Sequence, residues 1–201
     1  MGLRERKKQA TRSALSWAAI RLIVERGYDR VLVEDIATEA GVSPRTFNNY
    51  FGSKAEAVAS RQFDRCLRMA EALRERPAGE PLWEAITQAM LEQLQPGPEV
   101  TAHPRPDREA WAVGLRLMLE VPAIQAETLR AGALAETAIA AAVAARTGTD
   151  PAEDMYPTLV AATVIAAQNV ASQAFLTKKQ SIQTLLTDAL RQISAGLPPP
   201  R

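Results

Sequence analysis

Apolar residues recur at intervals of three and four along most of the chain, the spacing of one face of an α-helix. Runs in which β-branched and polar residues alternate, as in strands, are nearly absent. The pattern predicts an all-α protein. It places about nine helices, near residues 4–26, 33–40, 44–51, 53–76, 81–95, 107–121, 123–147, 153–178 and 181–195.

Helix-breaking residues mark the ends of several of these segments. Gly27 follows the first one, and Ser53 with Glu56 three residues later has the spacing of a capping box. Residues 77–81 read PAGEP and end the fourth helix. Residues 96–106, with four prolines and one glycine, are expected to form a loop.

Composition excludes several classes of protein. The chain has 201 residues, 47% of them hydrophobic, so it can bury a substantial core. A single cysteine, Cys66, and a single histidine, His103, exclude an internal disulfide and a histidine-rich metal site. We therefore expect no cofactor and no bound metal.

The first residues also bear on where the protein acts. Residues 1–12 are strongly basic and lack the apolar stretch of a secretion signal, so a cytoplasmic protein is expected. Residues 157–176 are apolar enough to raise the question of a membrane, but they include Gln168, Asn169, Ser172 and Gln173 and many alanines. They are interpreted as a buried helix, with no membrane partner.

The net charge of +1 hides an uneven distribution. Residues 1–65 contain 12 Lys and Arg against 8 Asp and Glu, whereas residues 66–201 contain 12 against 15. A positive head on a near-neutral body is the sign expected of a nucleic-acid-binding module.

The sequence VEDIATEAGVSPRTFNNYF at residues 33–51 has the grammar of a helix-turn-helix. Gly41 permits the positive φ of the turn, and Val42 fills the angle between the helices. Ser43 caps the second helix, with Pro44 in its first position. This motif predicts a helix that enters the major groove of DNA.

Phe47 and Phe51 share one face of that helix and are expected to pack inward. The outward face then consists of Arg45, Thr46, Asn48 and Asn49. Asn pairs well with adenine and Arg with guanine in the major groove. These four residues are predicted to read bases.

Phosphate contacts are predicted from flanking residues. Tyr50 and Lys54 lie where the second helix ends and the next begins, and they are expected to position the head on the DNA backbone. A basic group near the start offers further phosphate contacts, with a solvated surface as the alternative; it consists of Arg6, Lys7, Lys8 and Arg12.

These motifs resemble those of the TetR family of regulators, over about residues 10–58. The resemblance rests on Ala18-Ala19, Leu22, Gly27-Tyr28, Ile36-Ala37, Ala40-Gly41-Val42-Ser43, Thr46 to Phe51, Ser53 and Lys54. It implies an all-helical homodimer that represses transcription and leaves DNA when a small ligand enters its C-terminal body. The chain would then comprise a DNA-binding domain (1–52), a ligand-binding and dimerisation domain (53–196) and a flexible tail (197–201).

Two positions depart from the family pattern. Leu32 stands where a threonine commonly caps the second helix, so the start of that helix is less certain. Gly52 stands where proline is frequent after the Tyr-Phe pair. Neither change removes a base-reading position.

The body contains aromatic and sulfur-bearing residues on helical faces with few charges. Each alone is explained by an ordinary core, but together they predict a pocket for an apolar effector. Its predicted lining is Phe63, Met69, Trp83, Met90, Trp111, Leu115, Met118 and Phe175.

Residues 116–126 also resemble a TetR subgroup associated with acyl-CoA-like ligands. A fatty acyl chain or its CoA thioester is therefore the expected effector. Arg108, Arg116 or Arg130 would meet its anionic end, with solvated arginines as the alternative.

The last two helices combine a small-residue face with an apolar stripe and predict a homodimer interface. The residues chosen for it are Ala162, Ala166, Leu186, Leu190 and Ile193. Folding of these faces into a single chain is the alternative.

Two other functions fit the sequence less well. An enzyme is disfavoured because the chain has no nucleophile elbow, no phosphate-binding loop and no histidine to partner Cys66, so no catalytic residue is assigned. A helical interaction module without DNA binding would present an acidic or apolar face at residues 44–50. The Arg, Thr and Asn residues there favour DNA.

Overall fold

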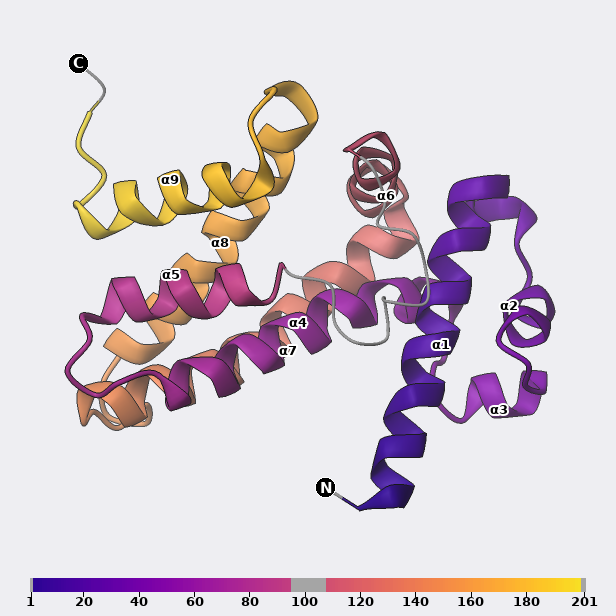
Figure 1. Cartoon of the computed structure of the whole chain (residues 1–201), viewed down its shortest axis with the longest axis horizontal. Coiled ribbons are helices and arrows are strands. Elements are labelled where there is room, and N and C mark those ends of the chain that lie inside the picture. The colour runs from indigo at the N-terminus through magenta and orange to yellow at the C-terminus, as the bar shows by residue number, and fades with distance from the viewer. Residues whose placement is uncertain (1, 95–107, 200–201) are drawn as a thin grey trace. The chain divides into compact units, whose positions relative to one another are not determined.

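A computed structural model describes residues 2–94 and 108–199, which form nine α-helices and one 3-10 turn and contain no strand (Figure 1). The helices are α1 (Leu3–Arg26), α2 (Val33–Glu39), α3 (Pro44–Asn48), α4 (Lys54–Glu75), α5 (Leu82–Glu92), α6 (Arg108–Glu120), α7 (Pro122–Thr147), α8 (Tyr156–Thr177) and α9 (Ile182–Ser194). The predicted all-α fold is confirmed. The predicted loop at 96–106 lies outside the described residues.

Two helix bounds differ from the pattern for identifiable reasons. The third helix was expected to reach Phe51 but ends at Asn48, because the N–H groups of Tyr50 and Phe51 both donate to the carbonyl of Phe47 and turn the chain. The eighth helix begins at Tyr156, after a turn closed by bonds from the Glu153 and Asp154 N–H groups to the carbonyl of Asp150.

The chain forms two compact units. Among the described residues, the first contains 2–62 and 108–131, and the second contains 63–94 and 132–199. The helices α4 and α7 therefore each contribute their first part to the first unit and the rest to the second. The predicted boundary after residue 52, between a DNA-binding domain and a ligand-binding domain, stays a prediction.

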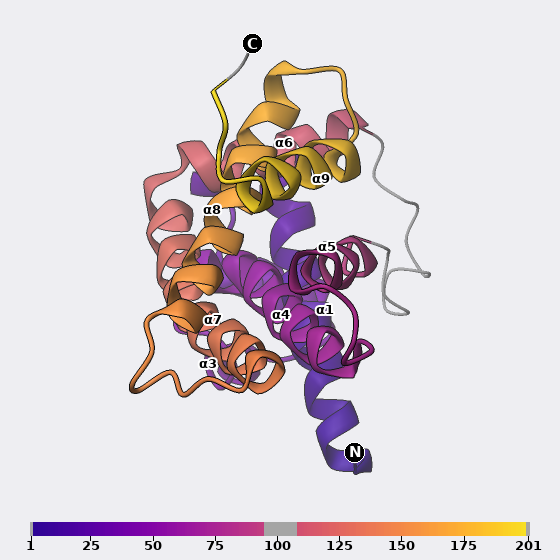
Figure 2. The same ribbon diagram turned by 90° about the vertical axis from the view of Figure 1, so that its left-hand side faces the viewer.

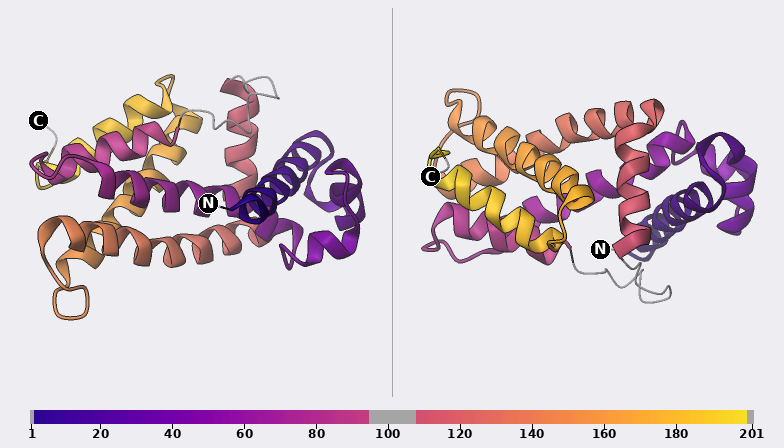
Figure 3. Two further views of the ribbon diagram at one scale, coloured as in Figure 1. Left: turned by 60° about the horizontal axis from the view of Figure 1, so that its bottom comes forward. Right: turned by 90° about the horizontal axis from the view of Figure 1, so that it is seen from above.

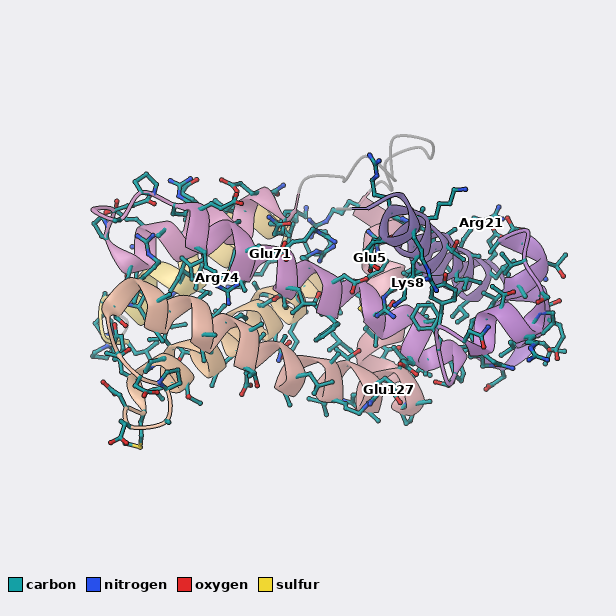
Figure 4. The ribbon with its side chains drawn as sticks, turned by 90° about the horizontal axis from the view of Figure 1, so that it is seen from below. Glu5, Lys8, Arg21, Glu71, Arg74 and Glu127 are labelled. Atoms are coloured by element: carbon teal, nitrogen blue, oxygen red, sulfur yellow. The ribbon has the colours of Figure 1, made fainter. Side chains whose placement is uncertain are left out.

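The first unit is built around the apolar stripe of α1. Leu15, Ala19 and Ile23 are at most 1% exposed and pack with residues from every other helix of the unit. Figure 3 shows α2 and α3 grouped beside α1. Arg21 of α1, which Figure 4 labels, also pairs with Glu39 at the end of α2. The result is a small head with a closed core.

The second unit contains α5, α8, α9 and the later parts of α4 and α7. The α9 helix packs on α8 and on α5 (Figures 1 and 2). Its buried stripe consists of Leu185, Leu186 and Leu190. On α8 the buried face is dominated by alanine and valine, and these small side chains allow close approach of its neighbours.

An arginine closes the end of α4. The guanidinium of Arg146 donates to the carbonyls of Arg76, Pro77 and Glu80 at 2.9 Å each, and to that of Leu73 at 3.4 Å. Leu73 lies in the last turn of α4, whose final carbonyls have no partner within the helix. The other three carbonyls belong to the turn that follows, so Arg146 holds this turn against the end of α4.

Two helices, α7 and α8, are long and apolar enough to cross a membrane by length and composition. Core helices of globular proteins pass the same test. One third of the most apolar window in each helix is buried inside the chain.

Candidate nucleic-acid interface

The turn between α2 and α3 has the geometry that the sequence predicts. Gly41 has a φ of +67°, a conformation that costs glycine little because it has no Cβ. The Val42 N–H donates to the carbonyl of Ala37 at 2.9 Å, and Ser43 Oγ accepts the N–H of Thr46 at 3.1 Å. Pro44 occupies the first turn of α3. These contacts fix the direction in which α3 leaves the turn.

One face of α3 is anchored in the core of the first unit. Phe47 and Phe51 are 0% and 1% exposed, and their ring centroids lie 5.7 Å apart at a tilt of 54°. Tilted aromatic pairs of this kind contribute about 0.5–1.5 kcal/mol beyond the area that they bury. The anchor leaves the opposite face of this short helix toward solvent.

Three of the four residues predicted to read bases are exposed to solvent. Arg45, Asn48 and Asn49 are exposed. Thr46 is half-buried, and its hydroxyl shares a 2.9 Å hydrogen bond with Ser43 Oγ. Tyr50 is half-buried and packs against the core of the head. The accessible polar surface of α3 therefore consists mainly of one guanidinium and two amides.

Lys54 lies inward, a position that the sequence did not reveal. Its ammonium donates to the carbonyl of Tyr28 at 2.7 Å and to that of Val31 at 2.8 Å, and Nζ lies 4.1 Å from the centre of the Tyr28 ring. Two of its three N–H donors are thus used inside the head. Lys54 fastens the 3-10 turn Tyr28–Arg30 to the start of α4. Its phosphate contact remains a prediction.

Tyr28 is itself affected by this packing. Burial, together with the nearby Asp29 and Glu127 carboxylates, raises the pKa of the Tyr28 hydroxyl above its usual value. The phenol therefore stays neutral, and its ring face is available to the ammonium of Lys54.

The start of α2 is capped by a residue that the sequence analysis missed. The N–H of Leu32 donates to Asp35 Oδ2 at 2.8 Å. Asp35 thereby makes one of the two hydrogen bonds of a capping box, the one from its side chain back to the backbone of the cap residue. The other bond needs a polar side chain at the cap, which Leu32 lacks. The usable signal was an acidic residue three positions after the expected cap. Leu32 itself is 60% exposed.

The predicted capping box at the start of α4 is present in altered form. Ser53 Oγ accepts the N–H of Glu56 at 3.0 Å. The Glu56 carboxylate, however, accepts the N–H of Gly52 at 2.8 Å. It therefore reaches the residue before the cap.

The basic start of the chain is helical. Because α1 begins at Leu3, the exposed Arg6, Lys7 and Lys8 lie on its first turns (Figure 4 labels Lys8). The guanidinium of Arg12 lies 4.8 Å from the centre of the Phe51 ring. Arg12 thus packs against Phe51, which follows the predicted base-reading residues.

The residues predicted to line an effector pocket are divided between the two units. In the second unit, Met69, Met90 and Phe175 are buried, while Phe63 and Trp83 are half-buried. In the first unit, Leu115 and Met118 are half-buried, and Met118 packs against the core of the head. The side chain of Trp111 lies outside the description.

The three arginines considered for an anionic ligand differ in their surroundings. Arg130 pairs with Glu127 at 2.9 Å and with Glu56 at 3.7 Å, which raises the pKa of its guanidinium. Arg108 and Arg116 are exposed on α6. Among the described residues, no group of three or more His, Cys, Asp or Glu is placed to hold a metal.

The residues predicted for the dimer interface differ in their exposure. Leu186 and Leu190 are only 2% and 1% exposed, because they hold α9 within the second unit. They therefore present no surface to a partner. Ala162, Ala166 and Ile193 line an outward groove of about 570 Å³ between α8 and α9.

Two protein-family models match the chain. Residues 17–59 match the model described as "Bacterial regulatory proteins, tetR family". Residues 80–198 match the model of the MftR C-terminal domain.

One characterised protein is similar along nearly the whole chain. The chain is 31% identical over 201 residues to the HTH-type transcriptional regulator TcmR of Streptomyces glaucescens, covering 98% of this chain and 87% of that protein.

Solved structures share the fold. A TetR-family regulator from Rhodococcus sp. has a TM-score of 0.55 at 24% identity, over 94% of this chain and 100% of its own. The fatty acid degradation regulator FadR from Bacillus halodurans has a TM-score of 0.56 at 17% identity, over 93% and 96%. The multidrug binding protein EbrR, complexed with imidazole, has a TM-score of 0.51 at 19% identity, over 94% and 96%.

Proposed function

Because the chain belongs to the tetR family of DNA-binding transcriptional regulators, we propose that it is a cytoplasmic repressor that holds a palindromic operator as a homodimer and releases it when an apolar effector binds. The observation that carries the proposal is the exposure of Arg45, Asn48 and Asn49 on a helix anchored from behind by Phe47 and Phe51.

The proposed reading mode follows from the side chains of α3. Arg45 has the paired donors that match guanine, and each asparagine has the donor and acceptor that match adenine. Each good pairing discriminates by about 1–3 kcal/mol. Thr46, Tyr50 and Lys54 complete the proposed set, with Tyr50 and Lys54 at the phosphates.

Basic residues on α1 add a part of the affinity that does not depend on sequence. Lys7 and Lys8 are exposed, and neither has an ion pair among the described residues. Each phosphate contact that they make would steepen the slope of log affinity against log salt concentration by about 0.9.

A homodimer is proposed through the outward face of α8 and α9. Val170 and Leu159 are 60% and 65% exposed, and Val170 also lines the groove between these helices. Exposed apolar side chains that gather on one face mark a surface for association with another molecule. Two reading helices about 34–36 Å apart would then meet successive major-groove faces of a palindrome.

The effector is proposed to be an elongated apolar molecule such as a fatty acid or acyl-CoA. The likeness to a fatty acid degradation regulator supports this choice, as do the buried Met69, Met90 and Phe175 of the second unit. The likeness to a multidrug binding protein supports a drug-like small molecule as the second candidate. Coupling between effector and operator is typically about 1–3 kcal/mol.

One experiment tests the core of the proposal. Duplexes bound by the full-length protein are selected from random DNA, without ligand and with a panel of acyl-CoAs and unrelated drugs. We expect enrichment of an inverted repeat, and loss of enrichment with one ligand class. No enrichment of any sequence would overturn the proposed function, and enrichment that no ligand changes would overturn the effector coupling.

A further inference from the structure

Gly52 contributes a hydrogen-bond donor at the junction of the reading helix with α4. Its N–H donates to Glu56 Oε2 at 2.8 Å. Proline, which is frequent at this place in the family that the sequence resembles, has no N–H. The bond therefore depends on a residue in which this chain departs from the common pattern.

The junction is short, so the bond acts close to the reading surface. The N–H groups of Tyr50 and Phe51 both donate to the carbonyl of Phe47, at 2.8 and 3.0 Å. Asn49 lies inside this turn, and Gly52 directly follows it. Fixing Gly52 to α4 thus limits how far the end of α3 can rotate.

Glu56 has a second partner, which comes from α7. Its other carboxylate oxygen, Oε1, lies 3.7 Å from Arg130 Nη2. Arg130 Nε in turn donates to Glu127 Oε2 at 2.9 Å, one turn earlier on α7. The Glu56 carboxylate thus links Gly52 to Arg130 of α7, and Glu127 orients the Arg130 guanidinium.

We propose that Gly52, Glu56 and Arg130 form a positioning relay that aligns the base-reading side chains of α3 with the state of α7. The relay rests on the proposed function. The helix α7 is continuous from Pro122 to Thr147, and its part after residue 131 belongs to the second unit. Through Glu56, the Arg130 guanidinium therefore connects Gly52 to a helix that the two units share. A displacement of the first turns of α7 would release Glu56 and with it Gly52.

The relay predicts a specific change in DNA binding. Misalignment of α3 weakens contacts to bases, while contacts to phosphates tolerate it. Variants that break the relay should therefore lose preference for an operator over a random duplex. They should retain binding to the random duplex.

The test uses full-length variants and a labelled duplex that the wild-type protein has selected from random DNA. Gly52→Pro removes the donor, Glu56→Ala removes the shared carboxylate, and Arg130→Gln removes the cation. We expect the ratio of operator to random-duplex affinity to fall about two- to ten-fold for the first two, the range of one hydrogen bond. A fall of about two- to five-fold is expected for Arg130→Gln, the range of an exposed ion pair.

Conservative variants separate the relay from a general loss of structure. Gly52→Ala keeps the N–H, and its new Cβ would lie 3.3 Å from the flexible end of Glu56, so the ratio should stay within about two-fold of wild type. Arg130→Lys keeps the charge and should retain most of the ratio. Combining Gly52→Pro with Arg130→Gln should cost no more than Gly52→Pro alone.

Each outcome decides the matter. Wild-type ratios for both Gly52→Pro and Arg130→Gln would overturn the relay, and so would equal losses on operator and random duplex. Additive losses in the combined variant would also overturn it. If the wild-type protein itself selects no sequence, the proposed function fails and the relay with it.

Discussion

The guanidinium of Arg12 stacks over the ring of Phe51, 4.8 Å from its centre. This contact joins α1 to Phe51, which follows the predicted base-reading residues of α3. Removing the cation, as in Arg12→Ala, should destabilise the head by about 0.5–1 kcal/mol, the range of such contacts at accessible sites. Thermal unfolding of the full-length protein measures the loss.

A matched control is available on the same helix. Arg6 is exposed on α1 and has the same charge. Arg6→Ala should change the free energy of unfolding by no more than about 0.5 kcal/mol, so the melting temperature should stay nearly the same. Equal losses in the two variants would show that charge alone, and not the stacking on Phe51, accounts for the effect.

Base reading by α3 is tested by Arg45→Ala and Asn49→Ala. Both side chains are exposed, so their removal leaves the core intact. Each change should lower affinity for the selected operator by about 1–3 kcal/mol and relax the preference at one base pair of each half-site. Repeating the selection with each variant shows which position relaxes. An unchanged consensus would assign reading to other residues.

Lys54 allows a sharper test, because its two roles have different signatures. Lys54→Met removes donors to the carbonyls of Tyr28 and Val31 and should destabilise the head by about 1–3 kcal/mol. If Lys54 also holds a phosphate, the slope of log affinity against log salt should become shallower by about 0.9. Chemical denaturation measures the first effect, and titrations at several salt concentrations measure the second. A stable variant with an unchanged slope contradicts both roles.

The local elements were predictable because their signals are local. Gly41, Ser43 and Pro44 specify a turn and a cap within a few residues, and the spacing of Phe47 and Phe51 specifies which face of α3 is buried. These signals require no knowledge of the rest of the chain. They sufficed for the fold class and for the exposed face of the reading helix.

Contacts between distant residues were not predictable in this way. Arg146 satisfies carbonyls near the end of α4 that lie 66 to 73 positions earlier, and Lys54 satisfies carbonyls 23 and 26 positions earlier. A charged side chain in the sequence looks the same whether it points to solvent or to a helix end. The burial of Leu186 and Leu190 within the single chain was not predictable for a related reason, since an apolar stripe does not show whether the same chain or a partner covers it.

The proposed dimer surface is best tested on α8, where Leu159, Thr163, Ala166 and Val170 follow one another at intervals of four, three and four. Leu159, Ala166 and Val170 are exposed in the single chain. An aspartate at Val170 would bury an unpaired charge in a dimer, at a cost of several kcal/mol, but would cost a monomer little. We expect Val170→Asp to sediment as a folded monomer at concentrations where the wild-type protein is a dimer.

Two controls distinguish surface from core on these helices. Thr158→Asp places the same charge about 120° from Val170 around α8 and should leave the dimer intact. Leu186→Ala removes a buried side chain and should destabilise the second unit by about 2–5 kcal/mol. A Val170→Asp protein that remains dimeric would move the interface away from this face of α8. A stable Leu186→Ala protein would contradict the core position assigned to that leucine.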